Sequence, residues 1–218
     1  VGNTTATIEQ FINDSTITVY TPSLSSEGSY GISVNVLGQV AQSSKTILFK
    51  TPKITKVEPY DVTFKDTLSI YGNFFSSISQ DNSVLINSSC CTSERIVYTS
   101  PTLIKIIIPT SINYTNPYIQ VTSPFGVVTK SNAFKIKAPI INSISKLQGR
   151  YGDTITIAGK YFNPDKSKNY ITVGGVNNYI IKATTEQVDF ILVNQTGGIK
   201  TVTLYNCGNL GALVTDKF

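Results

Sequence analysis

The residue types that most often carry chemistry are scarce in this chain. None of its 218 residues is a histidine, which excludes histidine-based catalytic triads and histidine-containing zinc sites. The acidic residues fall mostly in expected turns and form no Asp-x-Asp calcium motif, and no glycine-rich phosphate loop is present. We therefore expect no catalytic, metal or cofactor site here, and we predict that the chain is not an enzyme.

Three cysteines are the remaining candidates for covalent chemistry, namely Cys90, Cys91 and Cys207. An odd number cannot pair completely within one chain. Three arrangements are open. Cys207 could bridge to Cys90 or Cys91, the neighbouring Cys90 and Cys91 could bridge to each other, or all three could be free thiols.

Five Asn-x-Ser/Thr sequences could accept an N-linked glycan. Asn, Ser and Thr are so abundant that about this many would arise by chance, so the set alone is no evidence for secretion. If the protein is secreted, the two acceptors in equivalent loops of the repeat described below are favoured, Asn113 and Asn194. The full set of candidates is Asn3, Asn13, Asn87, Asn113 and Asn194.

Aromatic side chains are the candidates for contact with a partner. Phe125 falls at an expected hairpin tip, and Tyr114 and Tyr118 flank a loop. Tyrosine is favoured at binding surfaces because it offers a large contact area at low entropic cost. Aromatic residues at the ends of β-sandwiches more often fill the core, and we favour that interpretation for Phe125. No residue is assigned to partner binding from the sequence.

The charge distribution argues against a nucleic-acid partner. The net charge of +5 comes from 18 basic and 13 acidic residues, but only Arg95 and Arg150 are arginines and the lysines are dispersed. Nucleic-acid binding usually needs a basic stripe with exposed aromatic residues. No stretch approaches the roughly 20 apolar residues that span a bilayer. Any membrane attachment is therefore expected through a segment outside this chain.

An internal repeat indicates the elements that position these residues. Pro52 and Pro139 each precede an apolar stretch, and Asp66 and Asp153 each precede an alternating stretch that ends in glycine; both pairs are 87 residues apart. The alternation predicts a strand with one buried face. The glycine predicts a bulge or tight bend. The two aromatic residues that follow shortly after each glycine (74–75 and 161–162) are expected to plug the end of the core.

Later segments repeat as well, which completes about seven short strands in each unit. Residues 84–86 match 171–173, residues 103–108 match 188–193, and residues 118–121 match 201–204. This density of strands is typical of an immunoglobulin-like sandwich. We predict an all-β chain of tandem sandwiches in a rod, with a complete module at 51–138 and a complete or nearly complete one at 139–218.

The first 50 residues match only the second half of a module. Residues 1–3 resemble 173–175, and residues 17–22 resemble the stretch that ends at Pro109. We therefore predict that residues 1–50 are the C-terminal half of a module. Half a sandwich cannot bury its own core, so the missing strands must lie upstream, be supplied by a neighbour or be lost.

The repeated motifs resemble the IPT/TIG module, an immunoglobulin-like (E-set) fold found in plexin-type receptors, Rel-type transcription factors and some secreted glucan enzymes. The residues that carry the resemblance are the Pro-x-Ile at Pro139, the Gly-Asp-Thr-Ile-Thr-Ile-x-Gly-x-x-Phe that starts at Gly152, and the Val-Gly-Gly at Val173. The bias to Asn, Ser, Thr, Ile, Lys and Tyr, together with the tandem modules, also resembles the Tgr (tiger) cell-surface proteins of social amoebae.

These resemblances imply an extracellular protein for adhesion or recognition. It would be part of the ectodomain of a receptor on the outer side of the plasma membrane, and it would bind a protein partner on an adjacent cell, homophilic or heterophilic. One alternative is a set of accessory domains, including glycan-binding ones, of a larger secreted enzyme, which would predict a planar aromatic platform on one module. The other is an intracellular Rel-like dimerisation module, which would predict free thiols and no glycan.

The expected strand directions favour one of the cysteine arrangements. If seven antiparallel strands alternate, the loop after the third strand, with Cys90 and Cys91, faces the next module. The last hairpin of that next module, with Cys207, faces back. We therefore favour a bridge from Cys207 to Cys90 or Cys91 that clamps the junction, provided that the two Cα atoms lie within about 7 Å.

Overall fold

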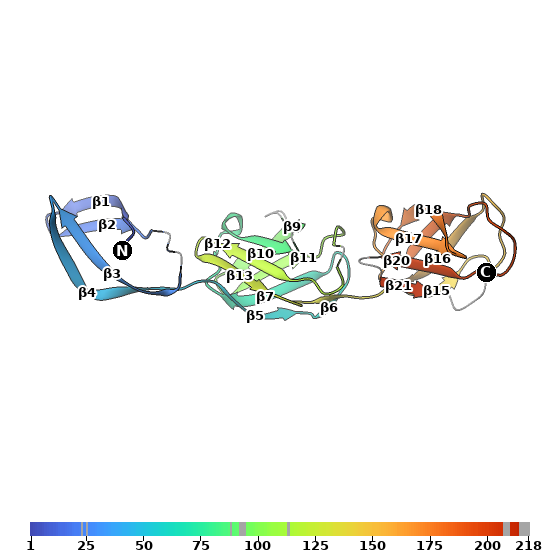
Figure 1. The fold of residues 1–218 in the computed structure, drawn as a ribbon, viewed down its shortest axis with the longest axis horizontal. Coiled ribbons are helices and arrows are strands. Elements are labelled where there is room, and N and C mark those ends of the chain that lie inside the picture. The colour runs from blue at the N-terminus through green and yellow to red at the C-terminus, as the bar shows by residue number, and fades with distance from the viewer. Residues whose placement is uncertain are drawn as a thin grey trace.

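The computed structural model describes residues 1–22, 24, 26–87, 89–91, 95–112, 114–206 and 210–213, without the side chains of 89–91 and 210–213. The strands form three bodies in a row along the long axis (Figure 1). We call them the first module (β1–β4), the second module (β5–β14) and the third module (β15–β21). The chain is thus an all-β protein of tandem immunoglobulin-like sandwiches in a rod.

The second module is a sandwich of two four-stranded sheets. One sheet has the order β10-β11-β7-β5 and the other β13-β12-β8-β9, and the short strands β14 and β6 pair in parallel beside them. The strands are β5 (Lys53–Glu58), β6 (Asp61–Val62), β7 (Thr67–Asn73), β8 (Ser83–Ile86), β9 (Ser89–Cys91), β10 (Ile96–Ser100), β11 (Leu103–Ile107), β12 (Ile119–Ser123), β13 (Gly126–Lys130) and β14 (Lys135–Ile136).

The third module repeats this plan with a continuous sheet in the order β15-β16-β19-β18-β17-β20-β21. The long strand β18 joins the two layers, because its first part pairs with β17 and its second part with β19. The strands are β15 (Ile140–Ile144), β16 (Thr154–Lys160), β17 (Asn169–Val173), β18 (Val176–Ala183), β19 (Gln187–Ile191), β20 (Val202–Asn206) and β21 (Leu210–Leu213).

Alternation of apolar residues builds both cores, as the sequence predicts. Leu68 and Ile70 on β7 and Ile155 and Ile157 on β16 are fully buried. One expected match was wrong by a single residue. Ile104, and not Leu103, is the equivalent of Val188, since Ile104 pairs with Ile70 and Val188 with Ile157. Because side chains alternate between the two faces of a strand, the slip would have placed the half-exposed Leu103 in the core.

Gly72 and Gly159 close their strands for a reason more specific than a bend. A Cβ atom on Gly72 would lie 2.0 Å from the carbonyl oxygen of Lys53 and 2.4 Å from the ring of Phe75. On Gly159 it would lie 2.0 Å from the carbonyl oxygen of Ile140 and 2.4 Å from the ring of Phe162. The predicted bulge is present on the partner strand in both modules. Glycine is therefore required by the close approach of a backbone and a core ring.

The first module consists of two hairpins, β1–β2 and β3–β4, formed by Thr7–Asn13, Thr16–Tyr20, Gly28–Val36 and Gln39–Phe49. None of its described residues is buried, and Phe11 is 66% exposed. Gly2 occupies the place of Gly174, because both have a φ near +57° and their N–H groups donate to the equivalent carbonyl oxygens of Gly31 and Thr201. The first module therefore corresponds to the part of the third module that begins at the Gly174 turn, and its apolar side chains are exposed.

Candidate binding surface and module junctions

The acidic residues that precede the repeated strands act as turn formers. A carboxylate oxygen of Asp66 accepts a hydrogen bond from the N–H of Thr63 (2.8 Å), and one of Asp153 accepts from the N–H of Arg150 (3.0 Å). Each aspartate thereby closes the turn that leads into β7 or β16. In the described part of the chain, no cluster of three His, Cys, Asp or Glu residues could hold a metal ion.

The junction between the second and third modules is built from direct contacts. The ammonium group of Lys137 lies 4.9 Å from the centroid of the Tyr161 ring, in a cation–π arrangement. The side-chain amide of Asn163 donates a hydrogen bond to the carbonyl oxygen of Thr110 in the second module (2.8 Å). Pro139 follows Lys137 by two residues and leads into β15. The cation–π contact, the hydrogen bond and the short linker thus hold these two sandwiches together.

The junction between the first and second modules repeats this device. Lys50 lies 5.5 Å from the centroid of the Phe74 ring, and these two residues are each 87 positions before Lys137 and Tyr161. A second link joins Lys53 to Glu27, with 3.3 Å between the charged atoms. The same pair of positions therefore orients successive modules at both junctions.

Phe74 and Tyr161 correct one expectation from the sequence. Only the second residue of each aromatic pair plugs the core, since Phe75 is 2% exposed and Phe162 is fully buried, whereas Phe74 is 38% exposed. Phe74 and Tyr161 have φ values of +61° and +65°, an uncommon conformation for residues other than glycine. This backbone conformation turns the first ring of each pair toward the preceding module.

Phe125 does not fill the core, which corrects a second expectation. It is 43% exposed at the turn between β12 and β13 and lines a hollow with Pro22 and Lys50 at the first junction. The hairpin between β12 and β13 thus faces the preceding module. The predicted bridge from Cys207 requires the corresponding hairpin of the third module to face back in the same way. Tyr114 is half exposed, and Tyr118 is partly buried beside β12.

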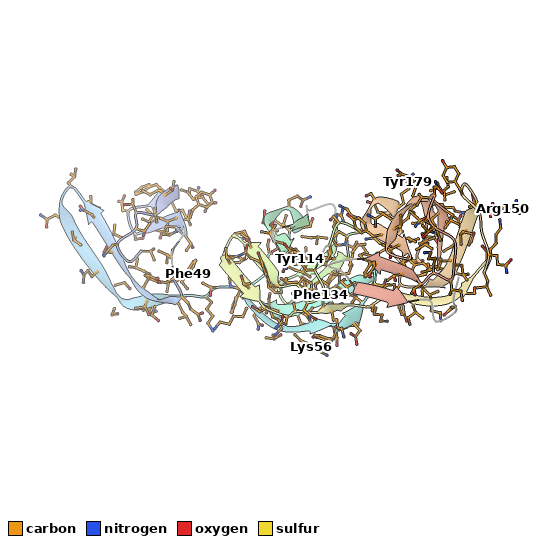
Figure 2. The ribbon with its side chains drawn as sticks, turned by 45° about the vertical axis from the view of Figure 1, so that its right-hand side comes forward. Phe49, Lys56, Tyr114, Phe134, Arg150 and Tyr179 are labelled. Carbon is orange, nitrogen blue, oxygen red and sulfur yellow. The ribbon has the colours of Figure 1, made fainter. Side chains whose placement is uncertain are left out.

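An exposed aromatic surface lies on the sheets of the third module, and the sequence analysis missed it. Tyr170 on β17 is opposite Tyr205 on β20, and Tyr179 on β18 lines the same shallow hollow as Tyr170, with a volume of about 330 Å³. Tyr170 is 63% and Tyr179 73% exposed, and Tyr205 is half-buried. Figure 2 shows Tyr179 projecting from the outside of the third module. We call these three residues the tyrosine face.

The polar groups beside the tyrosine face are bonded to one another. The Ser167 hydroxyl and N–H both donate to a carboxylate oxygen of Asp165 (2.7 and 3.0 Å), which lowers the pKa of that carboxyl. The side chain of Asn178 donates to the carbonyl oxygen of Val176 and accepts from the N–H of Val193. Lys166 and Lys168 are exposed and form no ion pair with any described carboxylate.

The predicted glycan acceptors differ in accessibility. Asn3, Asn13 and Asn194 are exposed. Asn87 is partly buried with a φ of +43°, and its side-chain oxygen accepts a hydrogen bond from the N–H of Tyr118 (2.6 Å). Asn113 lies outside the described residues.

The cysteine hypothesis stays a prediction. The backbones of Cys90 and Cys91 lie in β9, opposite Leu85 and Val84. Their side chains, and Cys207, lie outside the described residues.

No helix among the described residues is long and apolar enough to cross a membrane.

A comparison with curated proteins found no relative. Among solved structures, a surface glycan-binding protein from Prevotella bryantii shares 15% identity (TM-score 0.46) over 78% of this chain and 42% of its own. The extracellular region of plexin A4 shares 14% identity (TM-score 0.40) over 83% of this chain and 20% of its own. The protein SGBP-B from a complex xyloglucan utilization locus in Bacteroides uniformis shares 16% identity (TM-score 0.35) over 78% of this chain and 49% of its own.

The chain spans less than half the length of each of these structures, and the likenesses are too distant to carry an argument about function. The family model of the IPT/TIG domain matches residues 1–51 and 139–218, which together are more than half of the chain. Both matched segments contain the turn at Gly2 or Gly174 followed by two hairpins, β1–β2 and β3–β4 in the first module and β18–β19 and β20–β21 in the third. The chain therefore belongs to the IPT/TIG domain family.

Proposed function

We propose that this chain is part of the ectodomain of a cell-surface receptor that mediates cell–cell adhesion and recognition by binding a protein partner on another cell. The observation that carries the proposal is the repeated junction, in which Lys50 meets Phe74 and Lys137 meets Tyr161. Rigid, regularly joined sandwiches present their loops and outer faces at a fixed distance from the membrane. We further propose that the chain itself has no catalytic activity.

The proposed location is the extracellular side of the plasma membrane, with attachment through a segment outside this chain. Exposed acceptors at Asn3, Asn13 and Asn194 leave room for glycans on the first and third modules. Within the family, we propose that the protein is of the Tgr type, on the resemblance of composition and tandem modules described above.

A binding assay on intact cells tests the proposal. The chain would be secreted from a eukaryotic host in glycosylated form, coupled to fluorescent beads and incubated with living cells of its source organism. Specific, saturable binding that soluble chain competes away is the expected result. Beads that bind no better than beads carrying an unrelated sandwich protein would refute an adhesive role.

A second candidate, an accessory glycan-binding role, is favoured by the exposed tyrosines of the third module, since such a role predicts an aromatic platform on one module. Affinity electrophoresis of the chain in gels containing soluble polysaccharides would detect it. Retardation in such gels, without any binding to protease-sensitive sites on cells, would favour this role over adhesion.

A further inference from the structure

We propose that the tyrosine face of the third module (Tyr170, Tyr179 and Tyr205) is the surface on which the partner protein docks, and that the partner is an unlike chain whose matching surface is acidic at its rim. This inference rests on the proposed function and deepens it, because it assigns the binding to one face of one module.

The fold does not require these tyrosines. In the second module, Ser83 and Thr122 lie opposite each other at the positions that Tyr170 and Tyr205 occupy in the third. The residues that flank Tyr170, Asn169 and Ile171, are buried just as Asn82 and Val84, which flank Ser83, are buried. The two sandwiches therefore share their cores and differ on this outer face. Two large aromatic side chains at solvent positions need a reason other than stability.

The exposed area is suited to anchor a protein interface. An aromatic side chain offers about 150–250 Å² when fully exposed, so Tyr170 and Tyr179 leave roughly 250 Å² for a partner to cover. One side of a standard interface covers about 800 Å², so the tyrosines would form its centre and neighbouring residues its rim. Tyrosine is enriched among the residues that dominate binding energy, and combinations of Tyr, Ser and Asn are typical of antibody binding sites.

The hydrogen-bonding state of the neighbouring groups favours a protein over a sugar. Sugar recognition needs fixed polar groups that are free to bond the ligand's hydroxyl groups. Here the Ser167 hydroxyl is bonded to Asp165, and the Asn178 side chain is bonded to Val176 and Val193. The exposed groups that remain at the hollow are mainly aromatic surface, with one amide, Asn177, and the charge of Lys166.

The charges around the face favour an unlike, acidic partner over a second copy of this chain. Lys166 and Lys168 lie beside the hollow and Lys182 follows Tyr179 on β18, and all three are exposed. The carboxylates of Asp165 and Asp189 accept hydrogen bonds from Ser167 and Gln187 and keep their negative charges, so three lysines stand against two carboxylates and positive charge is in excess. In a two-fold contact between identical copies of this face, lysines would meet lysines, which is unfavourable. A partner with acidic groups at its rim would instead be attracted.

The test replaces Tyr170 and Tyr205 by their counterparts in the second module and Tyr179 by threonine. The variant Tyr170→Ser, Tyr205→Thr and Tyr179→Thr is compared with a matched control, Tyr98→Thr and Tyr151→Ser, which removes two other exposed tyrosines. Thermal unfolding confirms that both fold. Bead binding to cells is expected to fall at least 30-fold for the first variant, as for loss of a hot spot, and to stay within twofold for the control. Lys166→Glu with Lys168→Glu is expected to weaken binding at low salt.

Each of the other outcomes would refute a different part of the proposal. If the unmodified chain binds no cells, the proposed function itself fails. If it binds and the tyrosine variant binds equally well, the assignment to this face is overturned. Loss of binding after glycosidase treatment of the target cells, but not after protease treatment, would make the ligand a carbohydrate and overturn the protein partner. Sedimentation that shows a dimer dissolved by the tyrosine substitutions would make the partner a second copy.

Discussion

Replacing Gly159 by alanine should selectively destabilise the third module. The added Cβ atom would lie 2.0 Å from the carbonyl oxygen of Ile140 and 2.4 Å from the Cζ atom of Phe162. Ordinary carbon–oxygen contacts are about 3.3 Å or longer, so one neighbour must retreat by about 1.3 Å. Ile140 belongs to β15, which pairs with β16 through Ile141 and Gly159, and Phe162 is fully buried. Neither can move without loss of strand pairing or core packing.

The expected cost follows from these two clashes. Overpacking of a core costs about 1–3 kcal/mol, and a strand hydrogen bond that is lost adds about 1 kcal/mol. We expect the free energy of unfolding of the third module to fall by about 3 kcal/mol. For a domain of this size, each kcal/mol lowers the melting temperature by roughly 4–8 °C.

Hydrogen exchange measured by mass spectrometry on the whole chain can assign the loss to one module. Peptides from 140–206 should exchange faster in Gly159→Ala, while those from 53–136 should be unchanged, and Gly72→Ala should reverse this pattern. Gly197→Ala is the matched control, because a Cβ atom there would meet nothing within 4 Å. A loss below 1 kcal/mol in Gly159→Ala would refute the argument that close approach requires this glycine.

Four smaller predictions concern other parts of the chain. Asn169→Ala removes the side chain that bonds the N–H and carbonyl groups of Asn163, and should cost about 1–3 kcal/mol in urea unfolding of the third module. Ser167→Ala should raise the pKa of Asp165 toward its ordinary value in an NMR titration; since the folded-state pKa is lowered, the small stabilisation is present above the unfolded pKa and is lost as the pH falls through the folded one. Tyr161→Ser should loosen the second junction, seen as a broader distribution of inter-module angles by small-angle scattering and residual dipolar couplings, with Tyr98→Ser as the control. Glycopeptide analysis of the secreted chain should find less glycan on Asn87 than on Asn3, Asn13 and Asn194, because the Asn87 side chain is partly buried and bonded to Tyr118.

The cores were predictable because they depend on local alternation. The pattern around Leu68 and Ile155 predicts a half-buried strand from one segment alone, and its recurrence after 87 residues predicts a second sandwich. The orientation of the two rings in each adjacent aromatic pair was harder to predict. Alternation allows only one of two neighbouring residues on a strand to point inward, but the positive φ that turns Phe74 and Tyr161 toward the junction follows from tertiary contacts.

The tyrosine face was not predictable in the same way. Tyr170 lies between the buried Asn169 and Ile171, so its outward direction could have been inferred from alternation. Its nearness to Tyr205 depends on the register between β17 and β20, which are 35 residues apart at this point and separated by two other strands in sequence. The signal that could have found it was a comparison of outward positions between the repeats, in which Ser83 and Thr122 stand where the tyrosines are.

The division between repeated and variable positions suggests how such a rod can acquire specificity. One block of each module, from the lysine before the proline to the aromatic pair after the glycine, specifies both the plug of the core and the contact with the preceding module. Duplication of a module therefore duplicates its junction, and the rod keeps its geometry. The outer face of β17, β18 and β20 contributes to neither the core nor the junction, so Tyr170 can replace the equivalent of Ser83 without disturbing the array. Under the proposed function, the recognition surface can change on one module while the neighbouring modules keep the geometry of the rod.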